Sequence, residues 1–212
     1  FPSMDKMQMS GLSNFISFSA EIRALKAILA YKLFHKRTPL SVTFLTTGQC
    51  NFNCQACGIQ SVIKHDIPHE RFMSIIDEVA DAGAIRISFT GGGEPMMRDD
   101  IGELILHAKK KGLIVSMVTN GFFIDRKLDQ IRNLDLLLVS YDKTKQLKQK
   151  NVPVLGKVLE NAILARNSGI PVCLQTLLTK DTCLHIEDFF SISQQYGFVL
   201  SLQSLENWDQ ST

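Results

Sequence analysis

The sequence has no long apolar run, and no stretch approaches the roughly 18 consecutive apolar residues that a membrane-spanning helix needs. It also has no low-complexity tract and no Ser/Gly linker, so its 212 residues suggest one domain, or one domain plus an appendage. Charge is nearly balanced, with 23 Lys and Arg against 21 Asp and Glu. The net charge of +2 gives no general attraction to nucleic acid, and we expect no nucleic-acid partner.

Cysteines are few and odd in number, and three of the five lie within eight positions, at Cys50, Cys54 and Cys57. A secreted disulfide scaffold would spread an even number through a shorter chain. Clustered cysteines in a chain of this length instead fit a reducing compartment and a metal centre, so we expect a cytoplasmic protein. Cys173 and Cys183 stand apart and do not form a second cluster.

From residue 40 onward, short apolar segments alternate with longer amphipathic ones. The short segments predict strands at residues 41–47, 85–90, 113–118, 134–139, 171–178 and 198–203. The longer segments predict helices at residues 71–82, 99–111, 124–133, 154–168 and 186–196. This alternation predicts a parallel sheet with helices outside it. About six units are too few for a closed eight-stranded barrel, which leaves a partial, splayed barrel or an open doubly wound sheet.

The segment before residue 40 has a different pattern. Residues 15–36 predict one amphipathic helix with a basic end, and we treat residues 1–39 as an N-terminal helical extension and residues 40–212 as the barrel domain. Two interpretations of the helix are open. It packs across the barrel, or residues 15–37 contact a membrane surface or a partner, which would place the protein peripherally at the inner membrane face.

Four unusual segments each follow a predicted strand. The cysteine segment, residues 50–57, follows the first strand, and residues 91–95 follow the second. Residues 119–121 and 140–142 follow the third and fourth strands. The carboxyl ends of parallel strands share one rim, where ligands bind. We therefore expect these segments to form one site.

The spacing of Cys50, Cys54 and Cys57 is Cys-x₃-Cys-x₂-Cys, in a loop rich in Asn and Gln. Thiolates suit zinc or iron–sulfur clusters. A structural zinc site is normally closed by four ligands, and His65 or His69 could supply the fourth. Three cysteines alone suit a cubane with one iron left open to another ligand. A catalytic cluster and a non-catalytic zinc or redox-sensing module both remain open on this spacing.

The run Cys-Asn-Phe-Asn-Cys-Gln-Ala-Cys at residues 50–57 resembles the signature loop of the radical S-adenosylmethionine (SAM) superfamily. Gly-Gly-Glu-Pro at residues 92–95 resembles the glycine-rich motif of that superfamily, and the resemblance extends over residues 40–206. It implies a partial (β/α)₆ TIM-like barrel. It also implies that Cys50, Cys54 and Cys57 hold a [4Fe–4S] cluster whose free iron is chelated by SAM.

The resemblance further implies an enzyme that reductively cleaves SAM to a 5′-deoxyadenosyl radical, which abstracts hydrogen from a substrate. Lipid-linked, peptide and nucleotide substrates are all open, as is the choice among oxidoreductase, transferase and lyase. A small flavodoxin- or ferredoxin-like protein is the expected electron donor. Whether a C-terminal substrate-capping part belongs to the protein is also open.

Further residues are expected at the cofactor. The full set is Ala56, Gly91, Gly92, Gly93, Glu94, Thr119, Asn120, Ser140, Asp142, Gln175 and Gln203. The three glycines let the backbone approach a ligand, and their carbonyls and Glu94 could accept hydrogen bonds from the SAM ammonium. Gln175 and Gln203 are polar residues in apolar strands, which suggests an inward site, although a buried Gln can also pair with backbone.

The other positions carry alternatives. Ser140 and Asp142 resemble a Ser-x-Asp that ends the fourth strand in many relatives, and Asp142 could instead cap its loop. Thr119 and Asn120 could simply form an Asn-Gly turn. Ala56 stands where many relatives have an aromatic residue, so Phe52 could fill that space. The basic run at Lys143, Lys145, Lys148 and Lys150 is either a solvated face or an attractor for an anionic substrate or electron donor.

Overall fold

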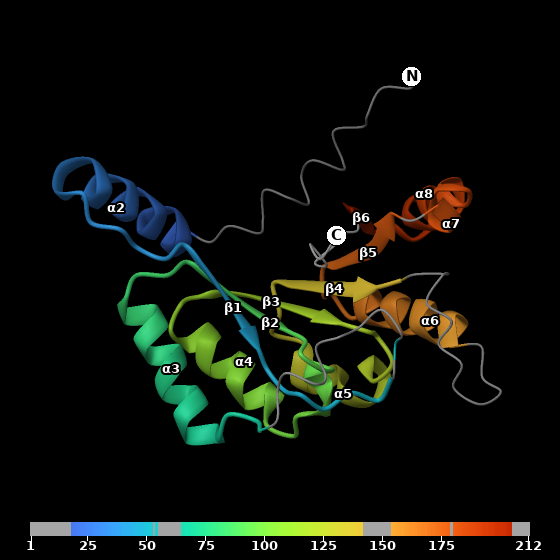
Figure 1. Ribbon diagram of the computed structural model, residues 1–212, viewed down its shortest axis with the longest axis horizontal. Helices are drawn as coiled ribbons and strands as arrows, with labels where there is room; N and C mark the ends of the chain where they lie inside the picture. The colour runs from blue at the N-terminus through green and yellow to red at the C-terminus, as the bar shows by residue number, and fades with distance from the viewer. Residues whose placement is uncertain (1–17, 53, 55–64, 142–153, 179, 205–212) are drawn as a thin grey trace, which may run out of the picture.

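The computed structural model describes residues 18–52, 54, 65–141, 154–178 and 180–204. Its strands are β1 (Ser41–Leu45), β2 (Arg86–Thr90), β3 (Ile114–Thr119), β4 (Leu136–Ser140), β5 (Val172–Leu178) and β6 (Val199–Ser204). They form one sheet in the order β1-β2-β3-β4-β5-β6, and all five neighbouring pairs are parallel (Figure 1). The predicted parallel α/β sheet is therefore confirmed.

Helices connect successive strands. The connecting helices are α3 (His69–Asp81), α4 (Ile101–Lys110), α5 (Ile124–Ile131), α6 (Val154–Asn167), α7 (Lys180–Cys183) and α8 (Ile186–Tyr196), and a further helix, α2 (Phe18–Phe34), precedes β1. At most of the helix ends, the observed bound differs from the predicted one by one or two residues, which is the usual scatter at helix termini. Two short elements were not predicted, α7 and a 3₁₀ helix, η2 (Pro95–Met97), because one turn is too short to show a periodic pattern.

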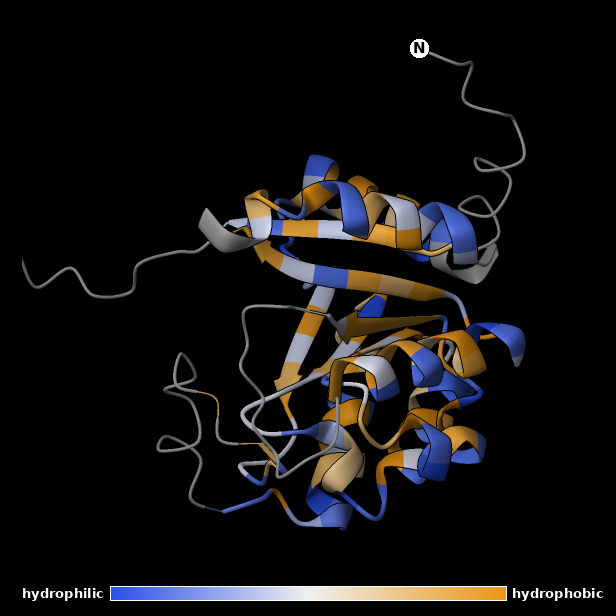
Figure 2. Ribbon diagram, turned by 90° about the vertical axis from the view of Figure 1, so that its right-hand side faces the viewer, coloured by the Kyte–Doolittle hydropathy of each residue, from blue (hydrophilic) through white to orange (hydrophobic). Residues whose placement is uncertain are grey.

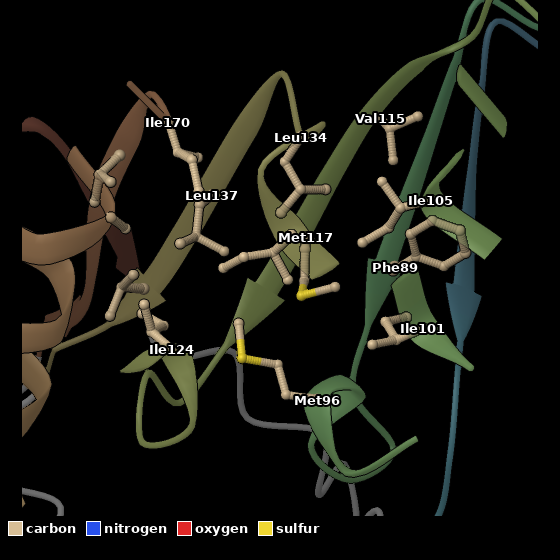
Figure 3. Packing of buried hydrophobic residues seen from close by; sticks show 14 of the residues in the cluster. Phe89, Met96, Ile101, Ile105, Val115, Met117, Ile124, Leu134, Leu137 and Ile170 are labelled. Carbon is tan, nitrogen blue, oxygen red and sulfur yellow. The ribbon is translucent and has the colours of Figure 1, made fainter. Parts of the chain in front are cut away.

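The hydrophobic core lies between the sheet and its helices. Alternate strand residues such as Phe89, Met117 and Leu137 are fully buried on the helix-covered face, where Phe89 lies beside Ile101 and Ile105 of α4 (Figure 3). Hydrophobic and hydrophilic residues alternate along the strands (Figure 2). Burial of these side chains is the main stabilising contribution to the fold.

The opposite, inner face of the sheet is more polar. Ser88, Ser116 and Ser140 occupy it, because successive side chains of a strand point to opposite faces. Burial alternates along β4, where Leu137 and Val139 are buried and Leu136, Leu138 and Ser140 are only half-buried.

Helix α2 is present, but its amphipathic packing is not confirmed. Arg23 is half-buried and donates hydrogen bonds to Ala84 O (3.0 Å) and Lys111 O (2.6 Å), just before β2 and β3. These bonds hold α2 at the amino ends of the strands (Figure 1). Its large apolar side chains are exposed, with Leu25 at 57% and Leu33 at 68%. No helix in the described part of the chain is long and apolar enough to cross a membrane.

Candidate functional site

The glycine-rich loop after β2 lies against the segment that leads from β1 into the cysteine loop. Gly93 N donates to Thr47 O at 2.6 Å, and Glu94 N donates to Gln49 O at 2.7 Å. A Cβ atom at Gly93 would stand 1.8 Å from Gln49 O, so only glycine allows this approach. Gly92 has a φ of 94°, a conformation that favours glycine. The glycine-rich motif is thus in direct backbone contact with the residues that lead into the cysteine loop.

Glu94 is buried, at 1% exposure, and both carboxylate oxygens accept hydrogen bonds from the protein. Oε1 accepts from the Thr119 hydroxyl (2.7 Å) and from Met96 N (3.1 Å), and Oε2 accepts from Asn120 N (2.8 Å). Burial raises the pKa of the Glu94 carboxyl, although these three hydrogen bonds oppose the rise. The side chain therefore joins the glycine-rich loop to the end of β3.

Asn120 continues this connection toward the cysteines. Its Nδ2 donates to Asn51 Oδ1 at 2.8 Å, and its Oδ1 accepts from Phe122 N at 3.0 Å. The Phe52 ring packs edge-on against Phe122, with centroids 5.5 Å apart. The buried Asn161 of α6 donates to Gly121 O (2.8 Å) and Phe122 O (3.1 Å). The loop after β3 is thereby fixed between the cysteine loop and α6.

Two of the three predicted cluster ligands fall within the described residues. Cys50 and Cys54 are half-buried, not disulfide-bonded and packed at the edge of the core. Phe52 N donates to Cys50 Sγ at 3.4 Å. Cys57, Ala56, Asp142 and the basic run at residues 143–150 lie outside the described residues. Within the described ranges, no three Cys, His, Asp or Glu residues form a metal-binding group.

The cysteine loop offers thiolate donors, which fit an iron–sulfur cluster and also fit zinc. Thiolate sulfur is the preferred ligand of such clusters. His69, one candidate for a fourth zinc ligand, is held elsewhere, with Nδ1 3.0 Å from Asp100 Oδ2 and Nε2 3.6 Å from Glu103 Oε2. Cys173 is a buried core residue, and burial raises the pKa of its thiol to about 11.

A pocket of about 310 Å³ opens on the inner face of the sheet near the carboxyl ends of the strands. Its lining is Thr90, Val118, Ser140, Gln175, Thr176, Leu177 and Gln203. Ser140 and Gln175 are register partners on β4 and β5, and Gln203 comes from β6. The structure thus brings three of the predicted site residues together in one cavity.

An arginine that sequence analysis did not single out also supports the rim. Arg98, whose side chain is 6% exposed, donates to Thr46 O (3.2 Å), to Ile67 O (3.1 Å) and to both oxygens of Asp100. The Thr47 hydroxyl binds the Asp66 carboxylate at 2.8 Å. These bonds hold the segment that follows β1 in place. Arg98 lies close after the glycine-rich motif, but no local pattern reveals that its partners lie 31 and 52 residues away.

Similarity to curated relatives extends over much of the chain. A PqqA peptide cyclase of Gluconobacter oxydans is 24% identical over 169 residues, which cover 75% of this chain and 47% of that protein. An Fe-coproporphyrin III synthase of Methanosarcina barkeri is 29% identical, over 76% of this chain and 43% of that protein. A probable GTP 3′,8-cyclase of Methanothermobacter marburgensis is 29% identical, over 82% of this chain and 60% of that protein. The chain thus spans about half the length of these relatives.

Solved structures share the fold. Streptococcus suis SuiB bound to precursor peptide SuiA aligns with a TM-score of 0.70 and 16% identity, over 87% of this chain and 44% of that chain. The structure of anSMEcpe with bound AdoMet aligns with a TM-score of 0.64 and 22% identity, over 80% of this chain and 52% of that chain. The partial-barrel prediction is confirmed by these neighbours. The family model of the radical SAM superfamily matches residues 44–190, so the chain belongs to that superfamily.

Proposed function

We propose that this chain binds a [4Fe–4S] cluster through Cys50, Cys54 and Cys57 and uses it to cleave SAM reductively. The observation that carries the proposal is the bonded connection of three motifs at one rim. Glu94 reaches Asn120, Asn120 reaches Asn51 beside Cys50, and Gly93 lies on the backbone that enters the cysteine loop. An ordinary strand-to-helix turn does not need a buried carboxylate with three protein donors.

We assign the cofactor contacts according to which hydrogen-bonding groups remain available to a ligand. The carbonyls of Gly91, Gly92 and Gly93 are suited to the SAM ammonium, whereas both Glu94 oxygens already accept from protein donors. Glu94 is then a positioning residue, as are Thr119 and Asn120. Ser140, Gln175 and Gln203 line the pocket and offer hydrogen bonds to ribose, adenine or carboxylate. Ala56 and Asp142 remain proposed contacts.

When bound, the cluster supplies the electron that splits SAM into methionine and a 5′-deoxyadenosyl radical. The chain's own residues orient the reactants and limit access of water. Val118 and Leu177 give the pocket an apolar part beside its polar groups, which suits a nucleoside with a flat ring and a hydroxylated sugar.

For the substrate, we favour a peptide over a nucleotide or a lipid-linked molecule. SuiB is described with its precursor peptide, and several curated relatives are PqqA peptide cyclases. GTP 3′,8-cyclases among the relatives keep the nucleotide in second place. We also propose a small flavodoxin- or ferredoxin-like electron donor and a reducing, cytoplasmic location, because an open iron–sulfur centre requires both.

Anaerobic reconstitution with iron and sulfide tests the proposed function. We expect about four irons and four sulfides per chain, and 5′-deoxyadenosine after addition of dithionite and SAM. Cys54→Ala should abolish the nucleoside product while the circular dichroism spectrum of the fold persists. Cys183→Ala, which removes an exposed cysteine, is the matched control and should retain the product. One bound zinc and no nucleoside would instead support the zinc module.

A further inference from the structure

Helix α2 turns its small side chains toward the body of the protein and its large apolar ones away from it. Ala24, Ala27 and Ala30 are half-buried on the side that Arg23 anchors. Amphipathic helices of globular proteins normally bury their largest apolar residues. The described part of the chain therefore leaves the larger apolar face of α2 uncovered.

The uncovered face is a continuous stripe. Ile22, Leu25, Leu29 and Leu33 are spaced by three and four residues, which places them along one side of a helix with 3.6 residues per turn. They are 38%, 57%, 48% and 68% exposed. Single exposed apolar residues are common on protein surfaces, but an ordered stripe over the whole length of a helix indicates a contact surface.

Basic side chains border this stripe. Lys26 and Lys32 are exposed and, at 3.6 residues per turn, lie on its two opposite sides. Lys36 and Arg37 follow the helix and line a groove of about 480 Å³ together with Tyr31 and Leu40. Glu21 is the one acidic residue of the helix sequence. Apolar contact flanked by positive charge complements an anionic lipid surface, since the lysine stems reach outward to the headgroups.

We propose that α2 is an interfacial helix that docks this protein on an anionic lipid surface. The stripe of Ile22, Leu25, Leu29 and Leu33 enters the acyl boundary, and the lysines pair with lipid headgroups. Contact with a second copy of the chain is disfavoured, because a two-fold interface would bring the lysines of both copies together. With 17 residues, α2 lies in the plane of the interface and does not span the bilayer.

The position of α2 also fixes which side of the protein faces the membrane. Arg23 holds α2 at the segments that precede β2 and β3, whereas the cysteine and glycine-rich loops follow the carboxyl ends of β1 and β2 (Figure 1). The docked protein therefore presents the rim with these loops away from the bilayer. The helix localises the protein, and it does not deliver a lipid from the docked membrane into the pocket.

Sedimentation of the full chain with vesicles tests the proposal. We expect binding to vesicles of phosphatidylcholine mixed with phosphatidylglycerol, and little binding to phosphatidylcholine alone. Replacement of Lys26 and Lys32 by Gln should weaken binding about 25-fold, since each basic side chain near an anionic surface contributes a factor of about five. Replacement of Leu25 and Leu29 by Ser should weaken it about a hundredfold, through lost apolar burial.

The matched control is replacement of the exposed apolar residues Leu184 and Phe190 by Ser, which should leave vesicle binding unchanged. Light scattering is measured on every variant. If no variant changes vesicle binding, α2 does not dock on lipid and the proposal is wrong. If replacement of Leu25 and Leu29 converts a dimer to a monomer, the surface is a protein interface and the proposal is also wrong. The readout needs neither cluster nor turnover, so its outcome is separate from that of the proposed chemistry.

Discussion

The side-chain amide of Asn120 donates a 2.8 Å hydrogen bond to Asn51 Oδ1. Asn51 directly follows Cys50, so this bond joins the end of β3 to the cysteine loop. The backbone N–H of Asn120 is itself held by the buried Glu94 carboxylate. A chain of hydrogen bonds from the glycine-rich loop to the cysteine loop thus passes through Asn120. A substitution at Asn120 can therefore measure how much this chain contributes to holding the cysteine loop.

Asn120→Asp should loosen the cysteine loop without unfolding the barrel. Aspartate keeps the oxygen that accepts from Phe122 N but faces Asn51 Oδ1 with a second oxygen instead of a donor. We expect faster iron loss from the reconstituted protein and a more negative cluster reduction potential, with little change in the melting temperature of the apoprotein. Asn133→Asp adds the same charge at an exposed position and should change neither. Identical iron retention in the two variants would show that the Asn120–Asn51 hydrogen bond does not hold the cysteine loop in place.

Gly93→Ala should separate the glycine-rich loop from the cysteine segment. The added methyl would stand 1.8 Å from the backbone oxygen of Gln49, which cannot move aside as a flexible side chain can. We expect a loss of about 1–3 kcal/mol in the free energy of unfolding, measured by urea denaturation, and poor cluster incorporation.

Gly156→Ala is the matched control for that change. Gly156 is exposed on α6, and no atom of the described residues lies within 4 Å of a Cβ at this position. Alanine there should stabilise the protein by about 0.5–1 kcal/mol, because glycine weakens a helix interior. Equal stabilities of the Gly93 and Gly156 variants would contradict the close approach.

Glu94→Gln should cost stability although it keeps the shape of the side chain. The amide group supplies one acceptor oxygen where the carboxylate supplies two, so its NH₂ must face a backbone N–H of Met96 or Asn120. One buried unsatisfied donor costs about 1–3 kcal/mol of unfolding free energy. Glu160→Gln on the exposed side of α6 should have almost no effect in the same denaturation experiment. A fully stable Glu94→Gln protein would show that the carboxylate is not a structural acceptor.

The Arg98–Asp100 pair should make the fold sensitive to acid. Burial raises the pKa of the Asp100 carboxyl, but hydrogen bonds from Arg98 and His69 outweigh it and hold the pKa below its ordinary value. A carboxyl with a lowered pKa stabilises the fold above the unfolded-state value of about 3.9, and the contribution is lost as pH falls through the folded-state value.

Thermal unfolding as a function of pH measures this contribution. Asp100→Asn should destabilise the protein by about 3 kcal/mol near neutral pH, since it leaves the buried Arg98 without its anion. The difference from the wild type should shrink as pH falls from the unfolded-state value of about 3.9 toward the lower folded-state value, where the carboxyl of the folded wild type becomes neutral. Asp129→Asn, in an exposed pair with Arg132, should differ little from the wild type at any pH. A pH-independent difference for Asp100→Asn would show that charge is not its cause.

The sequence by itself determined the repeating unit and the place of the site. Apolar runs such as the one in β4 alternate with helical patterns, and parallel connections leave few arrangements for that order. The cysteine motif follows β1 and the glycine-rich motif follows β2. Because the carboxyl ends of parallel strands share one rim, chain order alone predicts that the two motifs lie close together. These inferences depend on local spacing and chain order, which the sequence states directly.

Only the tertiary structure decided the partners across the rim and the direction in which α2 faces. Periodicity groups Leu25 with Leu29 on one side of a helix, but it does not say whether that side meets the barrel or the surroundings. The partners of Glu94, Asn120 and Arg98 lie in other loops, at distances along the chain that no local pattern encodes. A buried carboxylate without hydrogen-bond donors would lower the free energy of unfolding by more than the fold can tolerate. Its donors therefore come from whichever segments the tertiary packing places beside it.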